Sequence, residues 1–367
     1  MKIGVLTLPL HNNYGGILQA FALQNFLKEM GHEVYLVDYN PRKSLSTWKL
    51  PIAIAKRICL KFLLQKNVVV FKEREVKRKN REIQKFIDNY IQPKTLKIDD
   101  AVKLKKLENY KFDAYIVGSD QVWREKYNSK FITNYFFDFV GDNNSRKISY
   151  AASFGVDTWD YDKNITNTLK ELAKKFKAIS VREDSAIELC RTHLAVNAGF
   201  NLDPTMLIKK SKYQELLSPA VDSNDKLLLY ILDISPEKTS LINNVSKNLG
   251  YSSFSIGHSD ENETDPSITK WIEGFNTAKF VVTDSFHGCV FSIIFNKPFL
   301  VIGNNDRGLA RFNSLLKLFG LEDRLFFNDS ENVKDLINQS IDWSEVNKIL
   351  EFERNRSTRF LEMALNS

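Results

Sequence analysis

The chain has 367 residues, which is longer than a single hydrophobic core usually grows, so we expect two domains of ordinary size. Hydrophobic residues make up 43% of the sequence and charged residues 26%, a balance that excludes a disordered or fibrous protein. The 52 Lys and Arg residues outnumber the 45 Asp and Glu residues, and the formal charge of +7 favours anionic partners without choosing among them.

Targeting segments, membrane spans and cysteine frameworks are not indicated by the sequence. The N-terminus MKIGVLTLPL lacks the apolar region and cleavage site of a signal peptide and instead predicts a buried strand, so we expect a cytoplasmic protein. No stretch approaches the roughly 18 apolar residues that a span needs. The scattered cysteines and histidines give neither disulfide nor metal-ligand spacing, so no metal is expected. Nucleotide-binding glycine motifs are absent, and neither a nucleotide cofactor nor a nucleic-acid partner is expected.

In the first half of the chain, apolar runs typical of strands alternate with amphipathic helical patterns, which is the order of a parallel sheet covered by helices. A strand is expected at 2–8, a helix at 17–30 and a second strand at 33–38. From about 44 to 107 the pattern is helical and basic, and we interpret it as an insertion. Further strands are expected at 113–117, 147–152 and 178–181.

The pattern restarts after the turn-favouring pair Asp203-Pro204, where we place a boundary between domains of residues 1–204 and 205–367. Strands at 227–233, 280–284 and 299–302 alternate with helices near 236–249 and 267–276, and a closing helix at 343–365 is expected to pack back on the N-terminal lobe. The fold class is therefore α/β, with two Rossmann-like lobes, parallel sheets and a cleft between the lobes. Ligands bind at the carboxyl ends of such strands, so residues just after strands are the candidates for function.

The segment TDSFHGCVF ends a strand at Asp284 and begins a helix around His287. The free N–H groups and the positive dipole end of a helix favour an anion, and an imidazole there can donate a hydrogen bond or a proton to a phosphate. The neighbouring donor-site candidates are Ser285, Phe286 and Gly288. The competing interpretation is that Asp284 or Ser285 only caps the helix and His287 packs structurally.

Two further loops follow predicted strands. In GSDQVW, the candidates are Ser119, Asp120, Gln121 and Trp123. Asp120 is a candidate base toward an acceptor hydroxyl, and Trp123 a candidate ring for stacking on a sugar; the alternative is a helix-capping Asp and a Trp that fills the domain seam. In the first loop, glycines permit close approach of the backbone to a ligand, and the cleft candidates are Asn12, Asn13, Tyr14, Gly15 and Gly16.

Arg182 in SVRED also follows a predicted strand. Its planar guanidinium can hold a carboxylate or a phosphate through two parallel hydrogen bonds. The alternative is a surface ion pair with Glu183 or Asp184, which would contribute little to stability.

These motifs, together with NNYGGILQAFALQNFL, ISYAASFG and LDPTMLI, occur in the order that resembles the polysaccharide pyruvyl transferase family, in the branch found in capsular and exopolysaccharide gene clusters. The resemblance spans about residues 2–324. It implies a GT-B-like fold and phosphoenolpyruvate as a co-substrate without any cofactor. It also implies transfer of the enolpyruvyl unit to two hydroxyls of one sugar, in a surface polysaccharide or its lipid-linked precursor, giving a pyruvate ketal and phosphate.

The resemblance also assigns roles and exposes a departure. It implies that Arg182 binds the donor, and with the chemistry above it suggests that His287 helps phosphate leave while Asp120 assists a sugar hydroxyl. Many relatives carry an arginine two residues before the histidine, where this chain has Ser285. Arg307 and Arg311 follow the next strand, and we hypothesise that Arg307 replaces the missing cation. Some relatives have an acidic residue at the position of Gly16.

The basic stretch within the insertion has seven Lys and Arg residues between Lys72 and Lys85. Such a stretch is usually a solvated helix face. The sharper interpretation is that residues 48–85 contact the inner face of the cell membrane, where lipid-linked sugars reside. Two other functions stay open: a GT-B nucleotide-sugar glycosyltransferase, because fold alone does not fix donor chemistry, and a non-catalytic binding component of a polysaccharide assembly complex.

Overall fold

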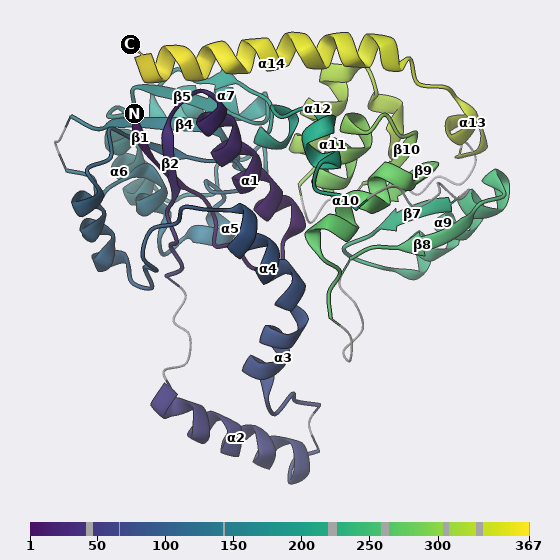
Figure 1. Cartoon of the computed structure of the whole chain (residues 1–367), viewed down its shortest axis with the longest axis horizontal. Coiled ribbons are helices and arrows are strands. Elements are labelled where there is room, and N and C mark those ends of the chain that lie inside the picture. Colours follow the sequence, from purple (N-terminus) through teal and green to yellow (C-terminus); the bar gives the residue numbers. More distant parts are fainter. Residues whose placement is uncertain are drawn as a thin grey trace.

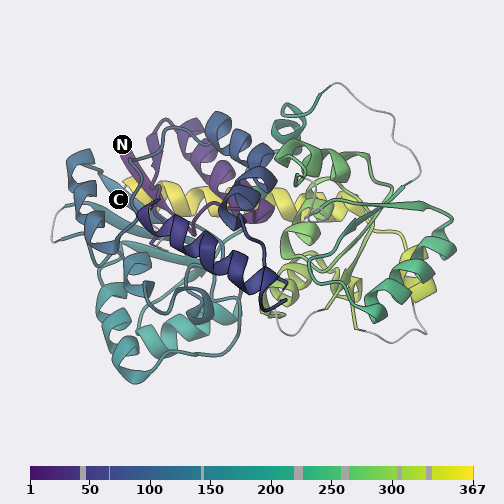
Figure 2. The ribbon, with the colours of Figure 1, turned by 90° about the horizontal axis from the view of Figure 1, so that it is seen from below.

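The computed structural model describes residues 1–41, 47–65, 67–141, 144–218, 226–257, 264–303, 308–327 and 333–366. These residues form two lobes that lie side by side, each built on one parallel sheet (Figures 1 and 2). The six described strands of the first sheet are β1 Lys2–Leu6, β2 Glu33–Leu36, β3 Ala114–Val117, β4 Arg146–Ala152, β5 Ala178–Val181 and β6 Gly199–Phe200. The five described strands of the second are β7 Lys226–Tyr230, β8 Ser252–Ser255, β9 Phe280–Thr283, β10 Phe299–Ile302 and β11 Leu325–Phe326.

The described strands of the second sheet repeat the order of the first five strands of the first sheet. The strand orders are β2-β1-β3-β4-β5-β6 and β11-β10-β9-β7-β8, with parallel pairing throughout the described strands. The order therefore reverses direction between β1 and β3 in one lobe and between β7 and β9 in the other. Every residue of β3, β9 and β10 is buried, as expected for strands with helices on both faces of the sheet. The two-lobed α/β architecture expected from the sequence is confirmed.

The first lobe contains α1 Tyr14–Glu29, α4 Arg81–Tyr90, α5 Glu125–Asn128, α6 Lys163–Ala173 and α7 Ser185–Leu189, and α8 Lys210–Gln214 follows it. The second contains α9 Pro236–Leu249, α10 Ile268–Thr277, α11 Phe286–Ile294, α12 Ala310–Phe319 and α13 Val333–Asn338. Helix α1 begins three residues earlier than predicted, because the Asn13 side chain caps it by accepting a 3.1 Å hydrogen bond from the Gly16 amide. The expectation that Tyr14 to Gly16 form a loop is therefore wrong: they are the first turn of α1.

The last helix, α14 Trp343–Asn366, runs across both lobes (Figure 1). It follows the second sheet in sequence, yet it is bonded to the first lobe. The Ser357 hydroxyl accepts a 3.1 Å hydrogen bond from the Leu202 amide, and Arg146 of β4 donates a 2.7 Å hydrogen bond to the Leu365 carbonyl. One continuous hydrophobic cluster, with members from α1, α11 and α14, joins the two lobes.

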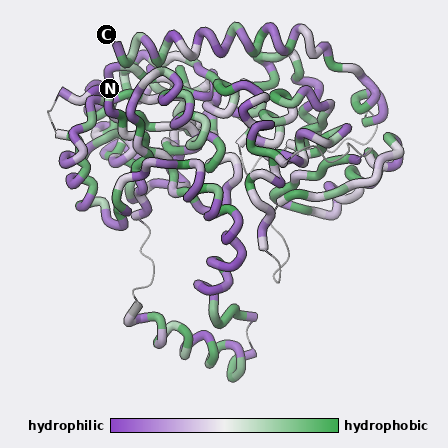
Figure 3. The backbone as a smooth tube through the Cα atoms, in the orientation of Figure 1, coloured by the Kyte–Doolittle hydropathy of each residue, from purple (hydrophilic) through white to green (hydrophobic). Residues whose placement is uncertain are grey.

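The predicted insertion over 44–107 divides into two parts. From α4 onward it belongs to the first lobe: Ile83, Phe86 and Ile87 of α4 are buried, and residues 94–98 run beside β2 through bridges from Leu36 and Tyr39. The other part, which we call the arm (residues 47–65 and 67–79), holds α2 Leu50–Phe62 and α3 Lys72–Lys79 and extends away from both lobes (Figure 1). Figure 3 shows α3 as hydrophilic and α2 as a mixture of hydrophobic and hydrophilic residues. No helix in the described part of the chain combines the length and apolar character needed to cross a membrane.

Candidate active site

A cavity of about 250 Å³ lies where the carboxyl ends of the two sheets meet. Its walls are the loops after β1 and β3 in one lobe and after β7 and β9 in the other, so both positions at which the strand order reverses open into it. Helix α12 adds one further residue. The lining residues are Asn12, Asn13, Asp120, Gln121, Tyr230, Leu232, Asp284, Ser285, Phe286, His287 and Arg311.

His287 is held between the lobes at the start of α11. Its Nε2 atom lies 3.6 Å from the Asp203 carboxylate, and the residue is only 6% exposed. On the other side the ring packs on the first turn of α1, where a Cβ atom at Gly15 would lie 2.0 Å from the imidazole Nδ1. Only glycine at this position leaves room for the ring, so Gly15 permits the observed position of His287.

Asp203 is the buried acid on which the site converges. Its Oδ2 atom accepts hydrogen bonds from Arg182 Nη1 at 2.7 Å and from Ser119 Oγ at 2.9 Å. Its Oδ1 atom accepts from the amide and the hydroxyl of Thr205 at 3.0 and 2.7 Å. Burial alone would raise the pKa of Asp203, but His287, Arg182 and the Thr205 hydrogen bond outweigh it and hold that pKa well below its usual range.

Arg182 is the partner of Asp203, and both side chains are about 1% exposed. The suggested surface ion pair with Glu183 or Asp184 is therefore wrong. Glu183 instead accepts hydrogen bonds from Ser153 and the Gly155 amide, and burial raises the pKa of its carboxyl. Among the described residues, the buried Nε and Nη2 atoms of Arg182 have no hydrogen-bond partner, and Arg182 is not one of the residues that line the cavity.

The Phe286 ring brings a second arginine beside the first. The guanidinium carbon of Arg182 lies 4.4 Å from the ring centroid and that of Arg311 lies 5.4 Å from it. Burial, followed by the neighbouring Arg182, lowers the pKa of Arg311 to about 10. Of these two buried cations, Arg311 lines the cavity and Arg182 does not, and an anion bound beside Arg311 would relieve their mutual repulsion.

Asp120 faces these cations from the loop after β3. Its Oδ1 atom accepts a 2.9 Å hydrogen bond from the Gln121 amide and lies 3.9 Å from Arg182 Nη2, while its Oδ2 atom accepts a 3.3 Å hydrogen bond from Asn13. The backbone of Asp120 is left-handed, with φ +75°, which is uncommon for a non-glycine residue and aims the carboxylate into the cavity wall. A Cβ atom at Gly16 would lie 3.1 Å from its Oδ2, so the small residue there leaves room for this carboxylate.

Several predicted site residues lie elsewhere. The Trp123 ring is fully buried in the first lobe, stacked on Phe136 with centroids 4.6 Å apart, so the expectation that it stacks on a sugar is wrong. Tyr14 is buried in the seam between the lobes, where its hydroxyl donates to the Pro266 carbonyl at 2.8 Å and its ring stacks on Trp271. Ser119 lies behind the cavity, against Asp203. Arg307 lies outside the described residues.

Asp284 lines the cavity, but its carboxylate is bonded to protein groups. It accepts hydrogen bonds from the Leu232 and Asp233 amides at 2.6 and 3.1 Å and from Lys238 Nζ at 2.6 Å. Asp284 therefore positions the loop after β7. Neither it nor Ser285 caps α11 with a side-chain hydrogen bond. Gly288 lets α11 approach β9, since a Cβ atom there would lie 2.2 Å from Thr283 Oγ1.

The model of the polysaccharide pyruvyl transferase family matches residues 13–306. This chain belongs to the polysaccharide pyruvyl transferase family. No curated protein sequence matches it. Of the residues that line the first cavity, all except Asn12 and Arg311 lie within the matched region.

Solved structures similar to this pyruvyl transferase have the GT-B fold. The UDP-N-acetylglucosamine 2-epimerase of Rickettsia bellii has 12% identity and a TM-score of 0.53, covering 100% of this chain and 97% of its own. The UDP-GlcNAc 2-epimerase of Neisseria meningitidis has 12% identity and a TM-score of 0.51, with 100% of both chains covered. UGT89C1 of Arabidopsis thaliana, solved with UDP-L-rhamnose, has 9% identity and a TM-score of 0.52, covering 100% and 98%. At these identities the likeness shows the fold alone.

The sequence interpretation missed one central residue of this pyruvyl transferase. Asp203 was interpreted as a domain boundary, because Asp-Pro is a turn pair, although it lies in the LDPTMLI motif just after β6. The position of Asp203 just after a strand of the first sheet was the signal that could have marked it as a site residue. Among the described residues, no group of three or more His, Cys, Asp or Glu side chains is arranged to hold a metal ion.

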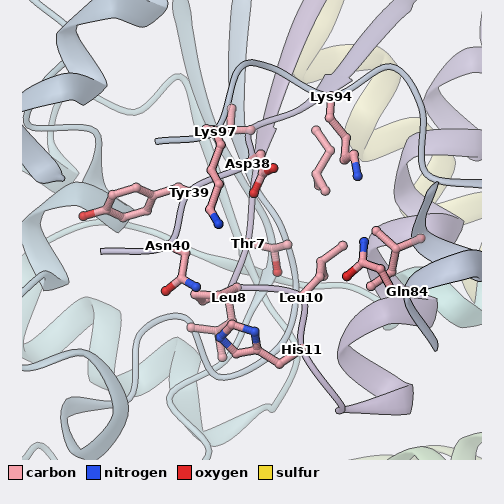
Figure 4. Close-up of a pocket in the computed structure, with 14 residues that line it drawn as sticks. Thr7, Leu8, Leu10, His11, Asp38, Tyr39, Asn40, Gln84, Lys94 and Lys97 are labelled. Atoms are coloured by element: carbon pink, nitrogen blue, oxygen red, sulfur yellow. The ribbon is translucent and has the colours of Figure 1, made fainter. Parts of the chain in front are cut away.

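A second cavity, of about 230 Å³, borders the loop after β1 (Figure 4). The two cavities share this loop: residues 7–11 line the second, and Asn12 and Asn13 line the first. Its polar lining comes from the loops after β1 and β2, from α4 and from the segment after α4. These polar residues are Thr7, His11, Asp38, Asn40, Gln84, Lys94 and Lys97.

Proposed function

We propose that this pyruvyl transferase moves the enolpyruvyl unit of phosphoenolpyruvate onto two hydroxyls of one sugar, in a surface polysaccharide or its lipid-linked precursor. The products would be a pyruvate ketal and phosphate, and phosphoenolpyruvate would be a co-substrate, with no cofactor. The observation that carries the proposal is the pair of buried cations on the Phe286 ring, of which Arg311 lines the cavity and Arg182 has two donors without a hydrogen-bond partner among the described residues.

The size and charge of the cavity support a small, highly charged donor. Phosphoenolpyruvate presents a carboxylate and a phosphate close together, and a guanidinium binds either through parallel hydrogen bonds. The volume of about 250 Å³ is below the roughly 300–1,000 Å³ of sites for drug-sized ligands, which favours this donor over a nucleotide sugar. Many relatives have an arginine where this chain has Ser285, and Arg311 would supply the missing cation. This assignment does not depend on the role of Arg307.

The reaction needs two hydroxyl protons to be moved. One sugar hydroxyl adds to the central carbon of the donor while the methylene carbon gains a proton and becomes a methyl group. The carbon–oxygen bond to phosphate then breaks, and the second hydroxyl adds to the same carbon. Of the two hydroxyl protons, one balances the new methyl proton and the other leaves on phosphate.

Two residues of the cavity suit these proton transfers. Asp120 is proposed to accept a hydroxyl proton, because its carboxylate lines the cavity and keeps lone pairs beyond its bonds to Asn13 and the Gln121 amide. His287 is proposed to donate a proton to the leaving phosphate through Nδ1, since its Nε2 points at Asp203. Arg182 and Arg311 would stabilise the charge that develops on the phosphate.

The acceptor sugar is proposed to occupy the second cavity. Its lining offers carboxylate, amide, hydroxyl and ammonium groups, the set that binds sugar hydroxyls, and the shared loop places it next to Asn13, which is bonded to Asp120. The two hydroxyls that react would have to enter the first cavity beside Asp120, with the rest of the acceptor in the second cavity.

Calorimetric titration with phosphoenolpyruvate, beside UDP-sugars, tests the donor. We expect saturable binding of phosphoenolpyruvate, weakened about tenfold or more in Arg311→Lys, which keeps the charge but loses the planar fork. Transfer is then followed by phosphate release and by the new methyl signal in proton NMR. Binding of a UDP-sugar alone would replace this proposal with a glycosyltransferase, and binding of phosphoenolpyruvate without turnover on any acceptor would favour a binding component.

A further inference from the structure

The arm presents an apolar face that points away from the rest of the molecule. None of the residues of α2 is buried, and three of its large apolar side chains are strongly exposed: Ile52 at 65%, Ile58 at 42% and Phe62 at 70%. With Pro51, Ala55 and Cys59 they recur at helical spacing along one side of α2. We call this side the outward face of α2. Trp48 and Leu63 extend it at either end, with exposures of 69% and 76%.

The opposite side of α2 is braced within the arm. Arg57 donates two 2.7 Å hydrogen bonds to the Glu73 carboxylate and a third, of 3.2 Å, to the Val70 carbonyl. This fork fixes the rotation of α2 about its own axis. The apolar side of α2 is consequently held outward, while Arg57 on its opposite side makes the contact with the rest of the arm.

The charges around the outward face have one sign. Residues 47–65 contain four basic residues and no Asp or Glu: Lys49, Lys56, Arg57 and Lys61. Arg57 is paired with Glu73, whereas Lys56 and Lys61 are exposed beside the apolar residues. Apolar side chains flanked by lysines form the pattern of a helix that lies in the plane of a membrane interface.

We propose that the outward face of α2 docks on a lipid bilayer that contains anionic lipids. Charge complementarity favours this occupant, because a second copy would bring two basic helices together. With 13 residues, α2 is about 20 Å long at 1.5 Å per residue, shorter than the roughly 30 Å hydrocarbon core, so it lies along the surface. We call α2 the anchor. The basic helix α3 links the anchor to the lobes and is not part of the outward face of α2.

The arm that carries α2 joins the first lobe beside the second cavity. Asn40 lines that cavity just before the arm, and Gln84 of α4 lines it just after the arm. A lipid-linked molecule held in the same membrane would thus be presented near the cavity. The docking itself does not depend on the proposed reaction, because it uses no residue of either cavity.

Flotation of the full chain on vesicles tests the inference. One set of vesicles is phosphatidylcholine, and in the other about a third of the lipid is phosphatidylglycerol. We expect the wild type to float with the anionic vesicles and more weakly with the neutral ones. Lys56→Glu combined with Lys61→Glu should reduce partitioning more than about tenfold, at roughly fivefold per basic residue removed. Phe62→Asp should reduce it by about tenfold or more.

Matched variants on α14, on the opposite side of the molecule from α2, are the controls (Figure 1). Phe352 is 67% exposed, so Phe352→Asp alters an equally exposed phenylalanine, and Lys348→Glu with Arg359→Glu makes the same change in charge. Both should float as the wild type does, and phosphoenolpyruvate titration reports separately on the site. Wild type that stays unbound, or Phe62→Asp that floats normally, would overturn the inference. A dimer that Phe62→Asp dissociates, without flotation, would do so too and would assign the face to a second copy.

Discussion

Replacing Asp203 by Asn tests whether one buried charge organises the site. The carboxylate accepts from Arg182 and Ser119 at one oxygen and from two groups of Thr205 at the other. An amide has a single oxygen, so its NH2 group must face one of these sets of donors. Breaking a buried pair while the other charge stays buried typically costs about 3–5 kcal/mol in free energy of unfolding, and we expect that range here.

Urea unfolding at pH 7 measures this cost, with Asp99→Asn as the control. Asp99 also makes a short ion pair, 2.6 Å from Lys103, but about half of each side chain is exposed, so we expect a loss below about 1 kcal/mol. The reasoning about Asp203 would be refuted if its variant lost no more free energy of unfolding than the control.

The pH dependence gives an independent check. The folded state lowers the pKa of Asp203, so the folded protein binds this proton less readily than the unfolded chain does. The stabilisation is therefore fully present above the unfolded value of about 4 and is lost as the pH falls below it. The gap between wild type and Asp203→Asn should be largest at neutral pH and shrink in acid, and a gap that stays constant would contradict the assignment.

Three further outcomes are expected. Gly15→Ala should lower kcat by about 100-fold or more, because its Cβ would displace the His287 ring, whereas Gly199→Ala, with open space around it, should leave kcat unchanged in the same steady-state assay. Lys97→Ala should raise the KM for the acceptor several-fold without changing the calorimetric affinity for phosphoenolpyruvate, and a change in donor affinity instead would place Lys97 in the donor site. Trp123→Ala should cost about 3–5 kcal/mol in urea unfolding, since the ring is core, and an unchanged midpoint would disprove that burial.

The sequence predicted most of the sheet scaffold and part of the site. The strands expected at 113–117, 178–181 and 299–302 agree with β3, β5 and β10 to within one residue at either end, because buried parallel strands are short apolar runs. Asp120, Ser285 and His287 were found because each follows a strand, and parallel topology brings such positions to one edge. The local sequence pattern was therefore enough to find those site residues that the order of parallel strands brings together.

What the sequence could not predict depends on contacts between distant segments. Asp203 and Trp123 were both judged from their neighbours in sequence, Asp203 as a turn residue and Trp123 as a ring that stacks on a sugar or fills the domain seam. In the structure Asp203 is bonded to Arg182, and Trp123 is enclosed by the first lobe. The buried face of α4 was a missed signal. Ile83, Phe86 and Ile87 have helical spacing and mark the point where the insertion returns to the lobe.

The helix that crosses both lobes has a mechanical consequence. Domains of one chain move freely when their interface is small and polar, but here the Tyr14–Trp271 stack, the shared apolar cluster and α14 all resist hinge opening. We therefore expect the cavity between the lobes to keep its shape before any ligand arrives, with Arg311 already in its wall. Binding should cost little reorganisation, so the specificity of this enzyme would come from a preformed shape more than from closure around its substrate.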